Sequence, residues 1–418
     1  MTYTNLIHDL GAQAKKSAFI LAQTDTPAIN GALRTLAEKL RDNHNTILEA
    51  NQKDVDAARA KELSSALIDR LTLTPERIEA IAQGVESIAQ LDDPVGTILE
   101  ETVRPNGLRI QKVSVPIGVL GMIYESRPNV TVDAAALCLK SHNAVILRGG
   151  SESLNSSKAL HTLIQEALKA HDIPEGAVCL VPDCDRAHVG DMLRAHDFID
   201  VMIPRGGRGL TSRVMNEATM PVFAHLDGNC HVYVHESANP ALAKEVILNA
   251  KLRRTGICGA AESLLLDEKL SCETAAGILA VLLDAGCAVA GDAESCGLDK
   301  RITPASEEDW ATEYLDARIS CKFVKDVREA AVHINRYGSH HTDSILAEDK
   351  AAADYFLKNV DSAIVMHNTS TQFADGGEFG MGAEIGIGTG KLHARGPVGV
   401  KQLTTFKYLV HGNGQTRP

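Results

Sequence analysis

One cysteine stands in surroundings suited to covalent chemistry. Cys258 lies in NAKLRRTGICGAAESLLLD (249–267), between two glycines and ahead of an apolar run. A free thiol has a pKa of about 8.5, so only a few per cent is thiolate at neutral pH. We expect the nearby cations Lys251, Arg253 and Arg254 to favour the thiolate, and the glycines to let a ligand approach closely. The alternative is that Cys258 is a small residue in a tight loop.

An asparagine follows the first strand expected in a parallel sheet. Asn129 stands in YESRPNVTVD (124–133), directly after the apolar run GVLGMIY. Ligands bind outside the carboxyl ends of strands in such sheets, so the Asn129 amide is placed to donate to a developing oxyanion. The alternative is that Asn129 caps the helix that follows, a common position for asparagine.

Two glycine turns that carry an arginine follow two further strands. Arg148-Gly149-Gly150 comes after AVIL, and Arg205-Gly206-Gly207 comes after DVMIP. A strand, a glycine-rich turn and a helix start together form a cradle of backbone amides for phosphate. Neither turn is a GxGxxG sequence, and a glycine turn without a ligand is the alternative.

Several histidines cluster in the later part of the chain. They are His333, the pair in SHHTD (339–343), and His367. A metal site needs ligands on one helix face or at a defined pair spacing, and adjacent histidines point in different directions. We therefore expect loop histidines with local hydrogen bonds and no metal site.

Composition excludes several classes of protein. The chain has 418 residues, 44% hydrophobic and 23% charged, with 54 acidic and 42 basic residues and a net charge of −12. Nucleic acid and anionic membrane surfaces both select clustered positive charge, so neither is an expected partner. The N-terminal segment reads as an amphipathic helix rather than a secretory signal. Nine cysteines without a CxxC pair indicate a reduced, cytoplasmic protein.

The pattern of apolar residues predicts helices first and then alternating strands and helices. Residues 1–95 have helical spacing, and two alternating runs flank the turn Pro105-Asn106-Gly107. Expected strands are GVLGMIYE (118–125), AVILRGG (144–150), GAVCLVP (176–182), FIDVMIPRGG (198–207) and MPVFAHLDG (220–228), with helices between them. Near-continuous apolar strands that alternate with helices indicate a parallel, doubly wound sheet.

A second α/β segment follows, so we expect two doubly wound α/β domains and an additional antiparallel element. The first domain comprises 1–97 and 117–228, and the second comprises 229–366. Residues 98–116 with 400–418 form the additional strands, and 367–399 form a Gly-rich return segment.

Together these segments resemble the aldehyde dehydrogenase superfamily over essentially the whole chain. The likeness is in particular to its branch that reduces glutamyl phosphate in proline biosynthesis. The most specific segments are YESRPNVTVDAAALCLKSHNAVILRGG, HLDGNCHVYV, NAKLRRTGICGAAESLLLD, YGSHHTDSI and EIGIGTGKLHARGPVG. The resemblance implies an aldehyde-dehydrogenase-like fold, in which the first domain binds NADP, the second is the catalytic domain, the additional strands are oligomerisation strands and the Gly-rich return segment lies near the active site.

The resemblance also implies a role for each matching position. Cys258 becomes the nucleophile, and Asn129 holds the oxyanion together with the Cys258 backbone N–H. Arg148 falls near the adenine ribose, where its charge suits the extra phosphate of NADP. Residues 205–209 fall near the pyrophosphate, and Glu313 falls at the glutamate that holds the nicotinamide ribose.

One departure from the superfamily concerns the release of the acyl group that the nucleophilic cysteine carries as a thioester. Most relatives have a glutamate in an ELGG stretch that activates water, whereas this chain has His225 in HLDG. That change fits an acyl group exchanged with phosphate, and implies NADPH-dependent reduction of L-glutamyl 5-phosphate to L-glutamate 5-semialdehyde. The alternatives are a non-phosphorylating aldehyde dehydrogenase and a catalytically silent binding protein.

Recognition of the substrate and of partner chains is the last expectation. Arg127, Lys391 and Arg395 are candidate partners for the substrate's anionic groups, with solvated surface cations as the alternative. The hairpin and the terminal strand pair between subunits in relatives, which predicts a homodimer or tetramer. An extra edge pair within the monomer is the alternative. Transient contact with glutamate 5-kinase, the enzyme that makes the acyl phosphate, is a further expectation.

Overall fold

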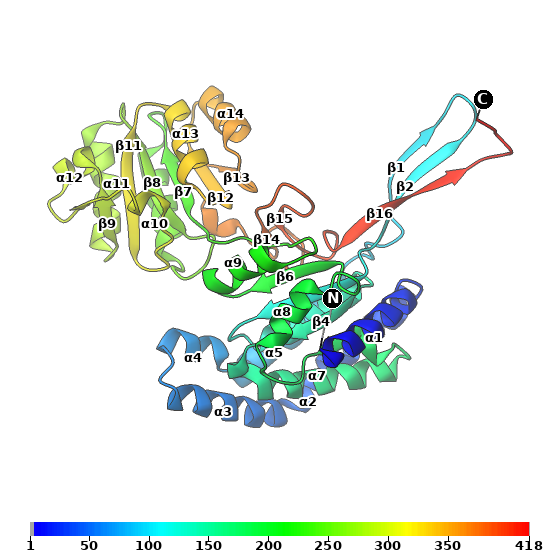
Figure 1. Ribbon diagram of the computed structural model, residues 1–418. Coiled ribbons are helices and arrows are strands. Elements are labelled where there is room, and N and C mark those ends of the chain that lie inside the picture. The colour runs from blue at the N-terminus through cyan, green and yellow to red at the C-terminus, as the bar shows by residue number, and fades with distance from the viewer. Residues whose placement is uncertain (1–3, 418) are drawn as a thin grey trace. The chain divides into compact units, whose positions relative to one another are not determined.

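The computed structural model describes residues 4–417 and divides the chain into two compact units (Figure 1). The first unit comprises Met1–Ala224, Gly380–Gly386 and Val398–Pro418, and the second comprises His225–Phe379 and Ile387–Pro397. The sequence-based limits place this boundary at 228 rather than 224. Within residues 4–417, no helix is long and apolar enough to cross a membrane.

Helices form the N-terminal part of the first unit, as the residue spacing predicts. Their bounds are α1 Asn5–Leu21, α2 Thr26–Asp42, α3 His44–Ala60, α4 Ser65–Leu71 and α5 Pro75–Gln90. Side-chain caps start three of them: Asp25 accepts from the Ala28 N–H, Ser64 from the Leu67 N–H and Thr74 from the Arg77 N–H. Apolar residues of α1, α2, α3 and α5 are buried along one face of each helix.

A parallel sheet with the strand order β5-β4-β3-β6 follows the helices. Its elements are β3 Val119–Tyr124, α6 Asn129–Lys140, β4 Ala144–Arg148, η1 Ser151–Ser153, α7 Leu154–Ala170, η2 Glu175–Ala177, β5 Val178–Leu180, α8 Ala187–Arg194, β6 Val201–Arg205 and α9 Arg208–Glu217. Every residue of β3 and β4 is buried, as their continuous apolar runs predict. Because β4 and β6 flank β3 on opposite sides, the strand order reverses at β3, the place where doubly wound sheets bind ligands.

The strand expected over residues 220–228 is wrong. Only a single bridge, Met202 with Val222, joins this segment to the sheet. Met202 donates to the Pro221 carbonyl oxygen and accepts from the Phe223 N–H, and the next donor toward this segment would be residue 204 of β6. Pro204 has no N–H, so the ladder stops there.

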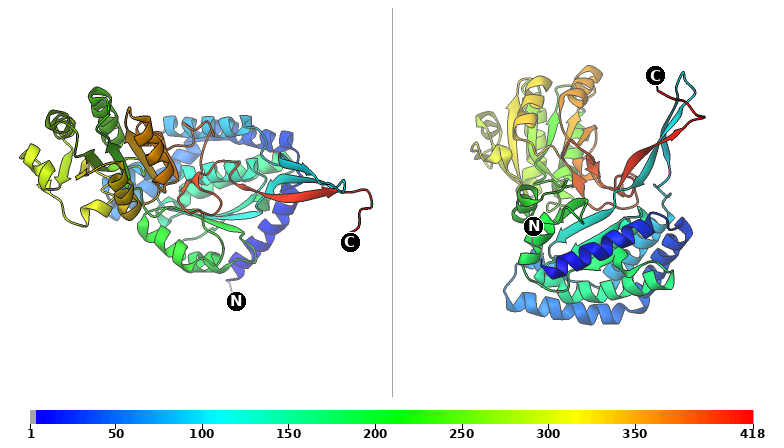
Figure 2. Two further views of the ribbon diagram at one scale, coloured as in Figure 1. Left: turned by 90° about the horizontal axis from the view of Figure 1, so that it is seen from above. Right: turned by 45° about the vertical axis from the view of Figure 1, so that its right-hand side comes forward.

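The predicted hairpin forms and pairs with the terminal strand. Strands β1 Ile98–Val103, β2 Arg109–Pro116 and β16 Thr404–His411 form an antiparallel sheet with β2 in the centre. Gly107 takes the positive φ of +85° that the turn requires. The three strands lie side by side in every view (Figures 1 and 2). Large apolar side chains are exposed on them: Ile98, Leu99, Val103, Phe406, Tyr408 and Val410.

The second unit has its own sheet with the strand order β10-β9-β11-β8-β7-β12-β13, and the pairs within it are parallel. The elements are β7 Cys230–Val234, α10 Pro240–Leu252, β8 Ala261–Asp267, α11 Cys272–Asp284, β9 Ala288–Gly291, α12 Ala293–Leu298, β10 Thr303–Pro304, η3 Asp309–Ala311, β11 Arg318–Val324, α13 Val327–Tyr337, β12 Thr342–Leu346, α14 Lys350–Asn359, β13 Ile364–His367, η4 Thr371–Phe373, β14 Ile387–Gly388 and β15 Gly396–Pro397. Val232 and Val234 pack against α10 and α11, whereas Tyr233 packs against α13 and α14. This alternation shows helices on both faces, which confirms the doubly wound class.

Five polar residues lie in loops at the amino edge of this second sheet. Glu313, Cys258, His225, His341 and Asp361 precede β11, β8, β7, β12 and β13, respectively. These five strands are neighbours in that order. Because parallel strands start at one common edge, the topology brings residues together that lie up to 136 positions apart in the sequence.

Candidate active site

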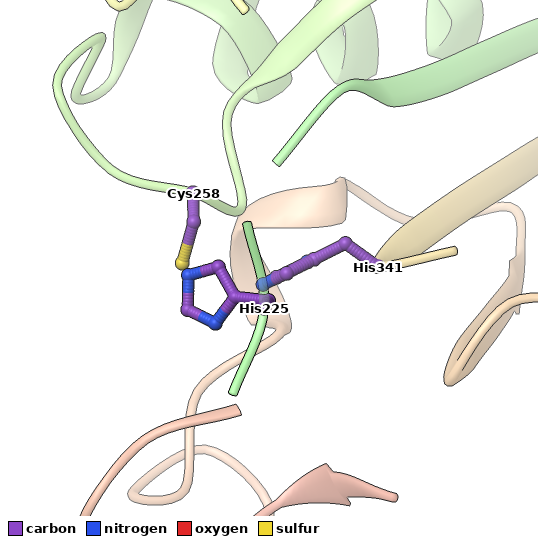
Figure 3. Close-up of side chains that lie close together, drawn as sticks. All are labelled: His225, Cys258 and His341. Atoms are coloured by element: carbon purple, nitrogen blue, oxygen red, sulfur yellow. The ribbon is translucent and has the colours of Figure 1, made fainter. Parts of the chain in front are cut away.

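Cys258 and two histidines form a compact group at the amino edge of the second sheet. The Cys258 Sγ and one ring nitrogen each of His225 and His341 all lie within 4.8 Å of one another. Figure 3 shows the Cys258 sulfur beside a ring nitrogen of His225, with the His341 ring directed toward both. The centroids of the two imidazole rings are 5.0 Å apart in an edge-to-face arrangement. A half-buried thiol between two imidazoles is suited to nucleophilic chemistry.

The protonation of His225 follows from its second contact. His225 Nδ1 lies 2.8 Å from the carbonyl oxygen of Ile387, and a carbonyl only accepts, so Nδ1 carries a hydrogen. The other ring nitrogen, Nε2, is therefore the one left for the Cys258 thiol. In this tautomer Nε2 can take the thiol proton, which makes the pair a thiolate and an imidazolium.

His341 is fully buried beside the same thiol. Its Nδ1 lies 2.9 Å from Thr342 Oγ1 and 3.7 Å from the Cys230 sulfur. Its Nε2 is buried and has no hydrogen-bond partner among the described residues. A buried nitrogen without a partner costs free energy, so its retention next to Cys258 points to a role with that thiol or its ligand.

The two histidines govern the ionisation of Cys258. Burial by itself raises the pKa of the thiol, but the charge of His341 and the hydrogen bond and charge of His225 outweigh it and hold the pKa well below its ordinary value. The expectation that Lys251, Arg253 and Arg254 supply this effect is wrong. Lys251 is fully buried and paired with Glu262 at 2.5 Å, and Arg253 donates to Gln372 at 3.3 Å.

The Lys251–Glu262 pair closes the base of the Cys258 loop. Lys251 lies in the last turn of α10 and Glu262 is the second residue of β8, so the pair ties together the two ends of the loop that carries the thiol. Burial raises the pKa of Glu262 to about 7, an effect that Lys251 opposes. Glu262 also accepts from the Leu315 N–H at 3.3 Å, which links the loop to the segment that contains Glu313.

Glycine at position 228 allows the His225 turn to touch the Cys258 loop. A Cβ at this position would lie 2.6 Å from the Cys258 Cα and closer still to its carbonyl oxygen. The Gly228 N–H donates to Glu313 Oε1 at 2.9 Å, and the Cys230 thiol donates to the Cys258 carbonyl oxygen at 3.1 Å. Burial raises the pKa of Glu313, and the Gly228 hydrogen bond opposes this. Glu313 therefore lies at the same edge and fixes the turn.

The carboxyl edge of the first sheet carries the residues expected to bind the cofactor. Arg148 ends β4 and Arg205 ends β6, with Tyr124 at the end of β3 between them. Two strand spacings separate the arginines by about 10 Å. Arg148 Nε is buried without a hydrogen-bond partner among the described residues, and its Nη2 donates to the Cys184 carbonyl oxygen at 3.4 Å.

Both glycine turns sit close to neighbouring groups. A Cβ at position 149 would lie 3.2 Å from the Tyr124 ring, and one at position 206 would lie 2.5 Å from Glu125 Oε2. The Gly207 N–H, which precedes α9, donates to that same Glu125 oxygen at 3.0 Å, so this amide already binds an anionic group. Two arginines, an arginine nitrogen without a partner and a helix start that binds a carboxylate fit a phosphate-bearing dinucleotide at this edge.

Asn129 is the first residue of α6 and makes no cap. Pro128 is the N-cap residue and no side chain caps the helix, so the capping alternative is wrong. Instead, Asn129 Nδ2 donates to Asp133 Oδ2 at 2.8 Å. Desolvation raises the pKa of Asp133 to about 6, although the Asn129 hydrogen bond and Arg205 lower it. The amide is thus held in place, and its Nδ2 has a second hydrogen.

The candidate substrate cations separate into two places. Lys391 and Arg395 both pair with Asp361, at 2.6 and 2.9 Å, beside the start of β13. The Arg395 Nε is buried without a hydrogen-bond partner in the described part of the chain. Arg127 lies in the first unit, in the turn between β3 and α6.

Comparison with known proteins agrees with this geometry. The family model described as "Aldehyde dehydrogenase family" matches residues 7–283. The chain belongs to the aldehyde dehydrogenase family. It is 57% identical to gamma-glutamyl phosphate reductase of Paramagnetospirillum magneticum, over 100% of both chains. The identity is also 57% with the protein of that name from Rhodospirillum rubrum, over 99% of this chain and 97% of the relative.

Solved structures of the family give the same result. A crystal structure of gamma-glutamyl phosphate reductase from Thermotoga maritima has a TM-score of 0.97 and 44% identity, covering 99% of this chain and 100% of that one. An acetylating aldehyde dehydrogenase from Geobacillus thermoglucosidasius has a TM-score of 0.72 at 18% identity, over 99% and 97% of the two chains. The fold expectation, aldehyde-dehydrogenase-like with parallel sheets and an antiparallel terminal sheet, is confirmed.

The role of His341 was not predicted for this aldehyde dehydrogenase family member. Sequence reasoning treated its histidines as locally bonded loop residues, and His225 only as a replaced glutamate. The order of the strands in the sheet is the signal that could have predicted the Cys258, His225 and His341 group, because residues that precede neighbouring parallel strands meet at one edge. Chain order alone does not reveal that β8, β7 and β12 are neighbours.

Proposed function

We propose that this chain is an NADPH-dependent reductase that converts L-glutamyl 5-phosphate to L-glutamate 5-semialdehyde and phosphate, the second step of proline biosynthesis. The observation that carries the proposal is the Cys258 thiol held between two histidines in a chain that matches glutamyl phosphate reductases over its full length. A nucleophilic thiolate and an activated acyl group together define acyl transfer to sulfur.

The first step forms a thioester. The Cys258 thiolate attacks the acyl carbon of the substrate, a C–S bond forms, and the C–O bond to phosphate breaks. His225 keeps the proton that it has taken from the thiol, because the Ile387 carbonyl oxygen accepts from Nδ1 and stabilises the imidazolium after the thiolate has become part of the thioester. The nucleophile is therefore ready at neutral pH without a separate base.

Negative charge develops on the acyl oxygen in both addition steps. We assign its stabilisation to the Cys258 backbone N–H and the Asn129 side-chain amide. The hydrogen bond from Asn129 to Asp133 restricts the amide, and a preorganised donor needs little reorganisation when the charge appears. Loss of one such donor typically costs about 10²–10³ in rate.

The residues that hold NADPH in this proposal are Arg148, Gly149 and Gly150 at the end of β4 and Arg205, Gly206 and Gly207 at the end of β6, with Glu313 for the nicotinamide ribose. When bound, NADPH supplies the hydride that reduces the thioester carbon. The Cys258 sulfur then leaves as a thiolate, and the His225 imidazolium stabilises it. The protein contributes orientation and electrostatics to this step.

The same histidine explains why phosphate rather than water exchanges the acyl group. A glutamate at position 225 would be a carboxylate able to take a proton from water. A protonated His225 has no lone pair for that purpose. Hydrolysis of the thioester to free glutamate is therefore slow, which favours the reductase over a non-phosphorylating aldehyde dehydrogenase.

Substrate recognition belongs to the same proposal. Arg127, Lys391 and Arg395 are our candidates for the α-carboxylate and phosphate, because guanidinium and ammonium groups match these anions. Lys391 and Arg395 share Asp361, so a carboxylate that binds there competes with an existing ion pair.

Assembly and location are further parts of the proposal. The apolar side chains exposed on β1 and β16 support a homodimer or tetramer built on this sheet. The cysteines of the described chain are free thiols, in keeping with a cytoplasmic enzyme. Glutamate 5-kinase, which would supply the labile acyl phosphate, remains our candidate for a transient partner.

The experiment that tests the proposal runs the reaction backwards. Purified protein is given glutamate 5-semialdehyde and NADP⁺ with and without inorganic phosphate, and NADPH absorbance is recorded. We expect steady turnover only when phosphate is present. Turnover that does not depend on phosphate would reject the reductase in favour of the hydrolytic enzyme, and no turnover in either case would reject both.

A further inference from the structure

The Cys258 group has the ligand set of a metal site as well as that of a nucleophile. One thiolate sulfur and two imidazole nitrogens are borderline-soft ligands that suit Zn²⁺. A zinc site with three protein ligands keeps a fourth position open for water or substrate, and Cys258 is only half-buried. The chemistry of the three side chains therefore fits a transition-metal ion.

The distances are also close to those of a metal site. Zn–N bonds of about 2.0–2.1 Å and Zn–S bonds of about 2.3 Å place tetrahedral ligand atoms roughly 3.5 Å apart. The three ligand atoms here lie within 4.8 Å of one another. Rotations that bring the rings about 1 Å closer would complete the geometry, and Figure 3 shows the three side chains gathered in one place.

A second observation points to a ligand at the same place. His341 is fully buried, yet its Nε2 has no hydrogen-bond partner among the described residues, while its Nδ1 contacts Thr342 Oγ1. His225 likewise has its Nδ1 held by an outer partner, because this nitrogen donates to the carbonyl oxygen of Ile387. A metal-binding histidine typically has one nitrogen fixed by an outer partner and the other directed at the ion.

We propose that Cys258, His225 and His341 bind a single Zn²⁺ ion in place of the acyl group, so that zinc inhibits the enzyme reversibly. The inference rests on the proposed function for its inhibitory part only, because binding of the ion requires nothing but the three side chains. The ion occupies the sulfur lone pair that attacks the substrate. No residue needs to be oxidised or modified, and a chelator restores the free thiolate.

Binding is tested on the full-length protein with zinc sulfate alone. Chelator-treated protein is dialysed against increasing Zn²⁺ and the bound metal is measured, beside the variants Cys258→Ala, His225→Ala and His341→Ala. We expect one ion per wild-type chain and at least about tenfold weaker binding in each variant. Cys272→Ser and His8→Gln, which change an exposed cysteine and an exposed histidine, are the matched controls and should bind as wild type does.

A second measurement does not depend on the folding of the variants. Wild-type protein alkylated at Cys258 by iodoacetamide should lose the site, and Co²⁺ should give a near-ultraviolet thiolate charge-transfer band only before alkylation. Stoichiometric binding that survives alkylation or any of the three substitutions would overturn the proposal. So would the absence of bound metal in wild-type protein.

Inhibition is measured separately in the reductase assay. We expect Zn²⁺ to abolish turnover, EDTA to restore it, and higher glutamyl phosphate to raise the zinc concentration needed. Zinc-free protein without reductase activity would reject the proposed function but leave the binding result intact. Full activity with one ion bound at these residues would overturn the inhibitory inference.

Discussion

Gly228 packs directly against the backbone of Cys258. A Cβ at position 228 would lie 2.6 Å from the Cys258 Cα, which no side chain tolerates without movement of the loop. We predict that Gly228→Ala lowers kcat at least about tenfold and costs roughly 1–3 kcal/mol of unfolding free energy, the usual cost of overpacking. Steady-state kinetics and urea unfolding measure the two effects.

Gly256→Ala is the control in the same loop. No atom outside its immediate neighbours lies within 4 Å of a Cβ built at this position. It should leave stability within about 0.5 kcal/mol of wild type. If the two substitutions had equal effects on kcat and on the free energy of unfolding, the close packing of position 228 against Cys258 would not be the cause of those effects.

The reactivity of Cys258 depends on its two histidines. Since His341 and His225 hold the thiol pKa well below its ordinary value, the thiolate persists as the pH falls below the usual range. We predict that His225→Gln and His341→Gln each slow alkylation by iodoacetamide at pH 7 about tenfold. The rate is followed by mass spectrometry of the Cys258 peptide in buffer with EDTA. Unchanged rates in both variants would refute the assigned cause.

The buried Lys251–Glu262 pair supports the loop that carries the thiol. Lys251→Met leaves Glu262 buried without its cation and should cost about 3–5 kcal/mol, measured by urea unfolding. Adding Glu262→Gln removes the second charge and should recover part of that loss. Lys350→Met, in the exposed pair with Asp354, should cost no more than about 1 kcal/mol. Equal costs for the two lysines would contradict the burial argument.

His333 makes the second unit sensitive to acid. Burial, with His231, Lys322 and Arg336 nearby, lowers its pKa to about 3. Below about pH 6.5, His333 is protonated in the unfolded state but stays neutral in the folded state. The free energy of unfolding therefore decreases as the pH falls from about 6.5 toward 3. His333→Phe should remove about 2 kcal/mol of the stability difference between pH 7 and pH 5.

Trp310 is a suitable probe for that experiment. It is the only tryptophan of the chain, and its ring centroid lies 6.0 Å from that of His333. Urea unfolding at pH 7, 6 and 5, followed by tryptophan fluorescence, compares wild type with the variant. Parallel pH profiles would show that His333 is not a source of the acid sensitivity.

Local sequence patterns predicted most elements but not the group around the thiol. Apolar runs located β3, β4 and β8 because buried parallel strands are apolar throughout, and Pro105-Asn106-Gly107 located the hairpin. The expected strand at 220–228 failed because Pro204 in the neighbouring β6 lacks the N–H that would extend the pairing, which a count of apolar residues ignores. The sequence also did not predict which groups stabilise the Cys258 thiolate. Lys251 is close to Cys258 in the sequence but forms an ion pair with Glu262, whereas His341 is far from Cys258 in the sequence but next to it in space.

The most direct test of the account is to capture the acyl group on Cys258. Protein is incubated with glutamate 5-semialdehyde and NADP⁺ without phosphate, digested, and analysed by mass spectrometry; phosphate is then added to a parallel sample. We predict a glutamyl adduct on the Cys258 peptide that phosphate discharges, and none in Cys258→Ala. An unmodified Cys258 in a protein that turns over, or an adduct that water removes as fast as phosphate does, would contradict the account.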